Sequence, residues 1–360
     1  ELELVRDGRG TAHVRAAGEL DAYFGLGFAH AQDRLAQMTW LVRAARGRIA
    51  EAIGRDGLAA DRWSRTLGLG RLADTRAEQL DPATRSRLDA YAAGVNAWID
   101  RIEAGDAQAP IALARLGVRA ERWTAADSLA VAKLLAWGLD GSVDAGLVLQ
   151  DLVMHLGAFA ARPFLPPEAA AQLVPVPLPR TEARVRPPGS AVEDPAVLAR
   201  AAGLAGRSIG SSAWVVSGRA AANGRPLLAG DLHLEPTAPS LLYEAHLAAP
   251  GFTVAGAGPV GVPVFWLAHN GRVAWAATHA RAAVVDLYVE TLDPEDPTRY
   301  RAGSQWRTLL RREERIAVRG ETAETWLVRE THRGPLLDGL VGPERPPLAL
   351  AWAGAQPGDG

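Results

Sequence analysis

The chain has 360 residues with 39 basic and 41 acidic side chains, a near-neutral balance that provides no electrostatic surface for phosphate backbones or anionic membranes. Cysteine is absent, which excludes thiol catalysis, disulfides and cysteine-ligated zinc. The length allows one large layered domain or two domains with a sizeable core, and neither nucleic acid nor membrane is an expected partner.

The opening residues ELELVRDGRG lack the basic start and apolar run of a secretory signal, although a trimmed mature chain would begin in the same way. Apolar stretches such as LAVAKLLAWGL, from Leu129, are too short to span a bilayer. The sequence therefore predicts a soluble protein, and the absence of cysteine agrees with an exported one. We expect a periplasmic or secreted location.

The first half of the chain shows helical periodicity. Apolar residues between Leu20 and Leu41 recur at spacings of three, four and seven, which predicts a helix that ends at Gly54. A second helix is expected to begin at Pro82, with Asp81 as its cap, and to continue through Ile99. Further helices are predicted over 124–137 and 147–156.

Between about residues 163 and 207 the composition changes to Pro, Ala, Arg and Gly, as in LPPE, VPVPLPR and RPPG. Such a segment buries little apolar surface and is typical of a linker. An ordinary interdomain loop would have the same composition, so both interpretations stay open at this point.

From Ser211 onward the pattern is rich in strands, among them AWVVSG, RPLLAG, SLLYEAHLA, FTVAGAG, PVFWLA, RVAWAAT and VVDLYVETL. Asn270 and Gly271 lie between two of these strands, and this dipeptide is the strongest short hairpin signal in a single sequence. A helical half therefore precedes a sheet half, which favours an α+β fold class.

The stretch RSIGSSAWVVSG places Ser211 directly before a strand and offers no catalytic base beside it. A serine hydroxyl needs such a base. If the bond between Gly210 and Ser211 were cut, Ser211 would carry a free α-amine with a reference pKa of roughly 7.7 to 8.0, a few atoms from its own hydroxyl. Gly210 tolerates the strained backbone that self-cleavage by an N-to-O acyl shift requires.

These residues also carry a family resemblance. GSSAWVVSG, NGRPLLAGDLHLEP and GPVGVPVFWLAHNGRVAWAATHARAAVVDLYVETL occur in the order that is typical of the β subunit of the penicillin amidase family of N-terminal-nucleophile hydrolases. The upstream segment from DGRGTAHVRAAG to GRIAEAIG is similar to the opening of the family's α subunit. The resemblance covers nearly all of the chain apart from the Pro-rich spacer.

The resemblance implies specific roles. Ser211 takes the position of the nucleophile, with autocatalytic cleavage after Gly210, and His233 matches a histidine that hydrogen-bonds the nucleophile in some branches. The backbone N–H of His279 matches an oxyanion-hole donor. The family's second donor is an asparagine at a position past residue 360. Ser212 departs from the family's usual asparagine, and DLH departs from the frequent DPH.

The resemblance further implies a four-layer αββα sandwich with a helical α-subunit region. On this basis we expect an α-subunit-like region at 1–185, a spacer at 186–210 and the N-terminal part of a β-subunit-like region at 211–360. Many members of the family bind structural calcium. Asp286 matches one of the ligands, whereas Ala283 replaces another, and calcium prefers six to eight oxygens.

Other polar and aromatic residues have simpler interpretations. His30, Asp33 and Arg34 are expected to form an ion-pair network on a helix, and not a metal site. His269 is expected to be a structural hydrogen-bonding residue. The tryptophans Trp214, Trp266 and Trp275 are expected in the core, although an acyl pocket would use such residues too.

The leading hypothesis is an N-acyl amide hydrolase that uses the serine through an acyl-enzyme and takes a small-molecule N-acyl substrate, with α and β chains from one precursor. β-Lactam side chains, acyl-homoserine lactones and other N-acyl amines all remain open as substrates. The alternatives are a non-catalytic relative or precursor fragment that binds acylated ligands, and a serine esterase with an ordinary Ser-His-Asp triad.

Overall fold

The computed structural model describes residues 2–164, 193–204, 210–280, 282–343 and 345–356. They group into two compact units, which we describe separately. Unit 1 comprises Glu1–Leu139, Leu198–Arg281 and Ile316–Glu324. Unit 2 comprises Asp140–Val197, Ala282–Arg315 and Thr325–Gly360.

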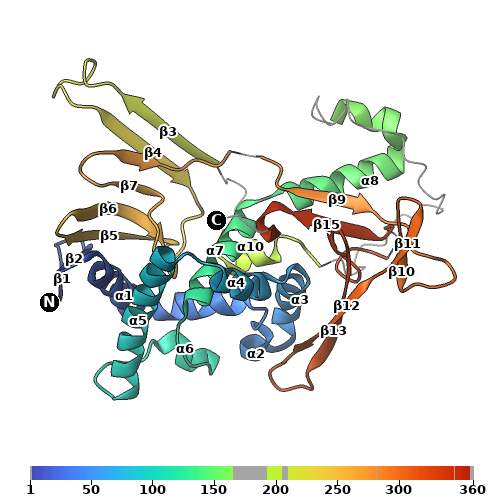
Figure 1. Cartoon of the computed structure of the whole chain (residues 1–360), viewed down its shortest axis with the longest axis horizontal. Helices are drawn as coiled ribbons and strands as arrows, with labels where there is room; N and C mark the ends of the chain where they lie inside the picture. Colours follow the sequence, from blue (N-terminus) through green and yellow to red (C-terminus); the bar gives the residue numbers. More distant parts are fainter. Residues whose placement is uncertain (1, 165–192, 205–209, 281, 344, 357–360) are drawn as a thin grey trace. The chain divides into compact units, whose positions relative to one another are not determined.

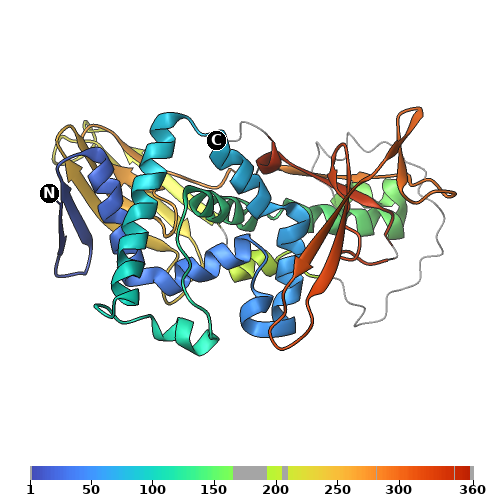
Figure 2. The same ribbon diagram turned by 60° about the horizontal axis from the view of Figure 1, so that its bottom comes forward.

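Unit 1 combines helices with a sheet and a ribbon (Figures 1 and 2). Its helices are α1 Glu19–Ala45, α2 Ala50–Ile53, the 3-10 helix η1 Gly54–Gly57, α3 Leu58–Leu67, α4 Leu69–Glu78, α5 Pro82–Glu103, α6 Ile111–Leu116, α7 Ala125–Leu139 and most of α10 Val197–Ala201. Its strands are β1 Leu2–Arg6, β2 Ala12–Ala16, β3 Gly210–Val216, β4 Leu227–His233, β5 Leu242–Ala249, β6 Phe252–Pro259, β7 Leu267–His269 and β8 Ala274–Ala276.

Helices α1 and α5 run side by side and form a tight pair (Figure 2), which we call the α1–α5 seam. A methyl group on Gly27 would collide with the carbonyl of Tyr91, and one on Gly94 would collide with the carbonyl of Phe24, so each backbone approaches the other at a glycine. Helix α5 begins as the sequence predicts, because Asp81 accepts hydrogen bonds from the backbone N–H groups of residues 83 and 84.

The first long helix ends earlier than the sequence predicts. Helix α1 stops at Ala45, Gly47 has a φ of +61°, and the short helix α2 begins only at residue 50. The buried carboxylate of Asp61 accepts hydrogen bonds from the backbone N–H groups of Ile49 and Ala50, both at 2.7 Å. These bonds satisfy the free amides of a new helix start, so the expected helix to Gly54 is divided in two.

The sheet of unit 1 has the strand order β1-β2-β5-β6-β7-β8. Strands β2 and β5 pair in parallel, with His13 opposite His246, and all other neighbours pair antiparallel. Helix α1 covers one face of the sheet, because a methyl group on Gly25 would collide with the buried side chain of Val14. The β7–β8 turn at Asn270 and Gly271 confirms the predicted hairpin.

Strands β3 and β4 form a separate antiparallel ribbon with Ser211 opposite Leu232 (Figure 1), which we call the β3–β4 ribbon. The ribbon contacts the sheet at β8, where a methyl group on Gly230 would lie 2.6 Å from the Ala276 Cβ. Because side chains alternate along a strand, Ala276 and its neighbour Trp275 point to opposite faces of the sheet. Helices, sheet and ribbon thus form successive layers, and the α+β class is confirmed.

Unit 2 contains one long helix and several short sheets. Its elements are α8 Ser142–Ala161, η2 Arg162–Phe164, β9 Val285–Val289, β10 Arg299–Ala302, β11 Gln305–Thr308, β12 Leu310–Ile316, β13 Glu324–Thr331, β14 Gly334–Pro335, β15 Leu348–Trp352 and η3 Ala353–Ala355. β12 ends, and β13 begins, in unit 1. Strands β9 and β15 pair antiparallel, and β10 pairs with β11. Helix α8 packs against β9 through Gly146, whose α-carbon faces Leu287.

The expected network of His30, Asp33 and Arg34 takes a different form. The His30 Nδ1 lies 2.7 Å from the Tyr91 hydroxyl in the core, and burial lowers the pKa of His30 to about 3, so this ring is neutral. Asp33 pairs with Arg6 on β1 at 2.7 Å. The prediction named the wrong cation because the partner of Asp33 comes from a neighbouring strand.

The predicted spacer at 186–210 falls largely on residues 165–192 and 205–209, which lie outside the described residues. Its described part contains α10. The division into 1–185, 186–210 and 211–360 concerns how the chain is processed, and the two compact units do not test it. It stays a prediction.

Candidate active site

Ser211 lies near the start of β3 and is half-buried. Its Oγ accepts a hydrogen bond from the backbone N–H of His279 at a nitrogen-to-oxygen distance of 2.7 Å. His279 follows β8 by three residues, in the segment after the predicted hairpin. The structure therefore brings together two residues, 68 positions apart, that the sequence selected for one site.

His233 lies at the end of β4, directly opposite Gly210 on β3. Cross-strand partners share a face of a ribbon and successive residues alternate, so the His233 ring shares a face with Gly210 and not with the Ser211 side chain. A methyl group on Gly210 would lie 3.2 Å from the His233 Nδ1. Gly210 therefore leaves room for the imidazole beside the bond where cleavage is expected.

The other ring nitrogen of His233 has a carboxylate partner. Its Nε2 lies 3.0 Å from the Asp231 Oδ2, and both side chains are about half exposed, at 46% and 63%. Asp231 was not among the predicted site residues. Its signal was nevertheless present in the sequence, since an acid two residues before a histidine on a strand shares its face. This bond fixes the ring tautomer, because one ring nitrogen must donate to the carboxylate.

The hydrogen bond of His233 runs to Asp231, and its predicted contact with the Ser211 hydroxyl stays a prediction for the cut chain. Ser212, the neighbouring serine, lies opposite Asp231 on the other face of the ribbon. Ser208, a second competing serine, lies outside the described residues.

The predicted calcium ligand Asp286 lies on β9 in unit 2, where it is exposed and pairs through its backbone with Ala351. Within the described ranges of the chain, no group of three or more His, Cys, Asp or Glu residues could hold a metal ion. Calcium also accepts backbone carbonyl and amide oxygens, so the role of Asp286 as a calcium ligand stays a prediction.

The three tryptophans that were expected in the core differ in burial. Trp266 and Trp275 are half-buried in the sheet, and the Trp275 indole N–H donates to the Phe265 carbonyl at 2.9 Å. Trp214 was expected in the core, but 56% of it is exposed on the β3–β4 ribbon. The prediction was wrong for Trp214 because two paired strands have two faces and the sheet contacts only one of them.

The described helices include none with both the length and the apolar character needed to cross a membrane.

Comparisons with known proteins identify the relatives of the chain. The family model described as Penicillin amidase matches residues 1–360. The penicillin acylase 2 proenzyme of Pseudomonas sp. (strain SE83) is 37% identical over 94% of this chain and 44% of its own length. The acyl-homoserine lactone acylase QuiP of Pseudomonas aeruginosa is 30% identical over 95% of this chain and 40% of its own length.

Among solved structures, a thermostable penicillin G acylase from Alcaligenes faecalis in tetragonal form matches with a TM-score of 0.39 and 22% identity. That match covers 52% of this chain and 98% of the other. The chain thus spans less than half the length of the two curated relatives described above.

Proposed function

Since the chain belongs to the penicillin amidase family, we propose that it carries the nucleophile half of an N-acyl amide hydrolase, activated by cleavage before Ser211. The observation that supports this most directly is the 2.7 Å hydrogen bond from the His279 N–H to the Ser211 Oγ. It places a fixed backbone donor at the oxygen that would attack a carbonyl. Relatives named as acylases, one of them as a proenzyme, agree with such chemistry.

The proposed activation is an N-to-O acyl shift. The Ser211 Oγ attacks the Gly210 carbonyl carbon, the C–N bond breaks, and the nitrogen takes the proton to become an amine. Water then hydrolyses the resulting ester, which leaves a carboxylate on Gly210 and a free hydroxyl on Ser211. The products are an α chain that ends at or before residue 210 and a β chain that begins at Ser211.

In the proposed turnover the new α-amine acts as the base for its own side chain. Its reference pKa of roughly 7.7 to 8.0 leaves a useful fraction unprotonated near neutral pH. The hydroxyl oxygen attacks the substrate amide carbon, the His279 N–H stabilises the developing oxyanion, and the amine leaves with a proton. Water then releases the acid from the acyl-enzyme. A backbone donor of this kind typically contributes about 3 kcal/mol.

His233 is proposed to serve as a positioning residue. Its ring lies against Gly210 and is held by Asp231, so it can orient the carbonyl side of the bond before cleavage. After cleavage Ser211 is a chain end, and its side chain would have to turn toward the face of Gly210 to hydrogen-bond this ring. This second contact is the one that the family resemblance implies.

Names of relatives suggest two substrate classes, namely the penicillins of penicillin acylases and the N-acyl lactones of acyl-homoserine lactone acylases. Both are small molecules with a linear amide between an acyl group and an amine. We propose this amide class as the substrate and keep the acyl chain open, because scattered pocket residues determine acyl specificity. We retain the proposal of an exported protein.

Intact-mass measurement of the full-length gene product tests the proposal. We expect two chains, one of which begins Ser-Ser-Ala-Trp, and hydrolysis of an N-acyl substrate. Ser211→Ala should leave one uncut chain and lower turnover by at least about 10³-fold. Ser212→Ala is the matched control, since Ser212 lies on the other face of the ribbon.

The alternatives predict different outcomes in the same experiment. A non-catalytic relative would remain one uncut chain without activity after long incubation. An esterase with an ordinary triad would keep its activity after chemical capping of the Ser211 amine, whereas the proposed mechanism loses it. If the Ser211→Ala variant were still cut, the nucleophile would have to be a neighbouring serine.

A further inference from the structure

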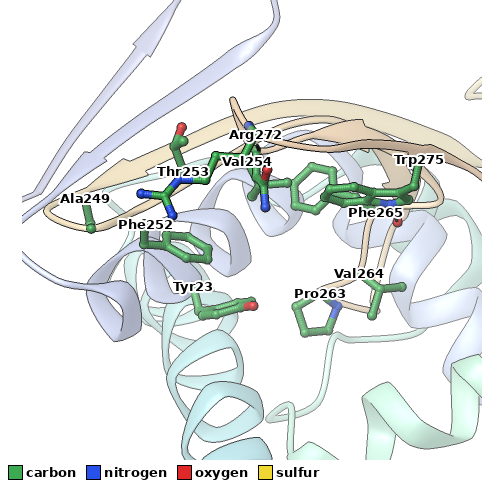
Figure 3. Close-up of a pocket in the computed structure, with 12 residues that line it drawn as sticks. Tyr23, Ala249, Phe252, Thr253, Val254, Pro263, Val264, Phe265, Arg272 and Trp275 are labelled. Atoms are coloured by element: carbon green, nitrogen blue, oxygen red, sulfur yellow. Dashed lines mark hydrogen bonds between the residues drawn. The ribbon is translucent and has the colours of Figure 1, made fainter. Parts of the chain in front are cut away.

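A second candidate site lies in unit 1 on the face of the sheet that helix α1 covers (Figure 3). It is a cavity of about 690 Å³ between the start of α1, the β5–β6 turn and the β7–β8 hairpin. Four aromatic side chains surround it, those of Tyr23, Phe252, Phe265 and Trp275. None of the residues that line it takes part in the chemistry proposed for Ser211.

The sheet separates this cavity from the candidate active site. Ala276 points toward the β3–β4 ribbon that carries Ser211, whereas its neighbour Trp275 points to the opposite face. Tyr23 reaches the cavity from helix α1, which packs on that same opposite face. A ligand in the cavity would therefore not contact the Ser211 hydroxyl.

The aromatic walls are held in place by interactions of their own. The Trp275 indole N–H donates to the Phe265 carbonyl at 2.9 Å, which joins β8 to the segment just before β7 and holds one wall together. On the opposite side, the Tyr23 and Phe252 ring centroids lie 5.9 Å apart. Figure 3 shows Pro263 and Tyr23 facing the same space from different segments. Flat rings held on two sides suit a flat apolar group between them.

The polar groups at the cavity favour an anion. Arg272 lies among the twelve lining residues and no Asp or Glu does, and within the described part of the chain its guanidinium has no ion-pair partner. The Asn270 side chain accepts the backbone N–H groups of Arg272 and Val273, which fixes the turn that presents this arginine. A guanidinium binds a carboxylate through paired, charge-assisted hydrogen bonds.

Tyr23 adds a neutral donor. Among the described residues its hydroxyl has no hydrogen-bond partner, and burial followed by the nearby charge of Glu19 raises its pKa. The hydroxyl therefore stays protonated at neutral pH and can donate to an acceptor in the cavity.

We propose that this cavity binds a small monocarboxylate with an aromatic tail, with the ring between the aromatic walls and the carboxylate at Arg272. The inference goes beyond the proposed function and does not depend on it, since none of the cavity residues belongs to the nucleophile site. The walls provide binding area and Arg272 provides the preference for charge.

The test uses the full-length gene product carrying Ser211→Ala, so that neither cutting nor turnover affects the readout. The probes are 3-phenylpropanoate and its uncharged analogue 3-phenylpropanamide, with affinities measured by calorimetry. Hydrogen–deuterium exchange locates binding, and the carboxylate should protect residues 249–254 and 270–275. Protection confined to residues 210–216 and 227–233 would place the ligand at the nucleophile site and would overturn the proposal. This result needs no further variant of the protein.

Two variants and one control test the assigned roles. Arg272→Gln should weaken binding of the carboxylate roughly tenfold or more and leave the amide unchanged. Phe252→Ala should weaken both probes. Arg9→Gln, which removes an exposed arginine from the β1–β2 turn of the same unit, should change neither. Equal effects of Arg272→Gln and Arg9→Gln on the carboxylate would also overturn the proposal.

Discussion

The α1–α5 seam and the β3–β4 ribbon lie on opposite faces of one sheet and are built in opposite ways. In the seam, two helix backbones touch at Gly27 and Gly94, and the side chains between them are buried. The ribbon touches the sheet near Gly230 and exposes 56% of Trp214 and 70% of Val215. The groups proposed for chemistry therefore lie in a part of the molecule where few stabilising contacts depend on them.

The seam should be the part of the molecule that is most sensitive to added volume. Gly27→Ala places a methyl group against the Tyr91 carbonyl, and since neither backbone can give way, we expect a loss of about 3 kcal/mol in unfolding free energy. Urea denaturation measures this loss. Gly8→Ala is the control, because a methyl group there has open space and should cost under about 0.5 kcal/mol. Equal stabilities of the two variants would remove the contrast between seam and ribbon.

The break between α1 and α2 provides a second comparison within the helical region. Asp61→Asn replaces a carboxylate that accepts two backbone N–H groups by an amide with only one acceptor oxygen. We expect a loss of about 2 kcal/mol, because one buried N–H is left without a partner. Asp106→Asn, at an exposed position, should be neutral. A stable Asp61→Asn variant would mean that the helix end does not depend on this carboxylate.

The pH dependence of the unfolding free energy should reflect the burial of His30 on helix α1. Burial lowers the pKa of His30 to about 3, whereas an unfolded histidine titrates near its ordinary value of 6.5. As the pH falls, the unfolded chain therefore binds a proton before the folded chain does. The contribution of neutral, buried His30 to the unfolding free energy is complete above pH 6.5 and is lost as the pH falls toward 3.

Between pH 6.5 and 5 this linkage amounts to about 2 kcal/mol. His30→Gln should flatten the decline of unfolding free energy in that range, as measured by urea denaturation at several pH values. His269→Gln, which replaces an exposed histidine on β7, should leave the decline unchanged. An unaltered slope in His30→Gln would show that His30 is not buried as a neutral ring.

The smallest change in unfolding free energy is expected for a substitution on the β3–β4 ribbon. Trp214→Thr removes a large side chain that is more than half exposed, and threonine keeps a good strand propensity, so the unfolding free energy should change by under about 0.5 kcal/mol. Thermal unfolding of the full-length protein measures it. A loss above about 1 kcal/mol would show that the native protein covers this face of the ribbon.

Features with local causes were predictable from the sequence. Asp81 and Pro82 predicted the start of α5, and Asn270-Gly271 predicted the β7–β8 turn. Each of these signals lies within a few residues of the feature that it predicts. The role of His279 was implied by the family resemblance, whereas its hydrogen bond to Ser211 becomes visible only in the folded chain.

Features with distant causes were not predictable. The end of α1 depends on Asp61, a carboxylate more than ten residues away that carries no cap signal of its own. The exposure of Trp214 depends on which face of the ribbon meets the sheet. The aromatic cavity combines side chains from α1, the β5–β6 turn and the β7–β8 hairpin, and no periodic pattern in the sequence connects these segments.

The parallel pairing of β2 with β5 has a consequence for any chain cut at Ser211. Residues 12–15 pair with residues 245–248, so the two fragments would share one continuous hydrogen-bonded sheet. Neither fragment could dissociate without tearing that sheet apart, and each would expose unsatisfied strand edges if it were alone. The chain would therefore have to fold before it is cut, and unit 1 should still unfold in one cooperative transition after the cut.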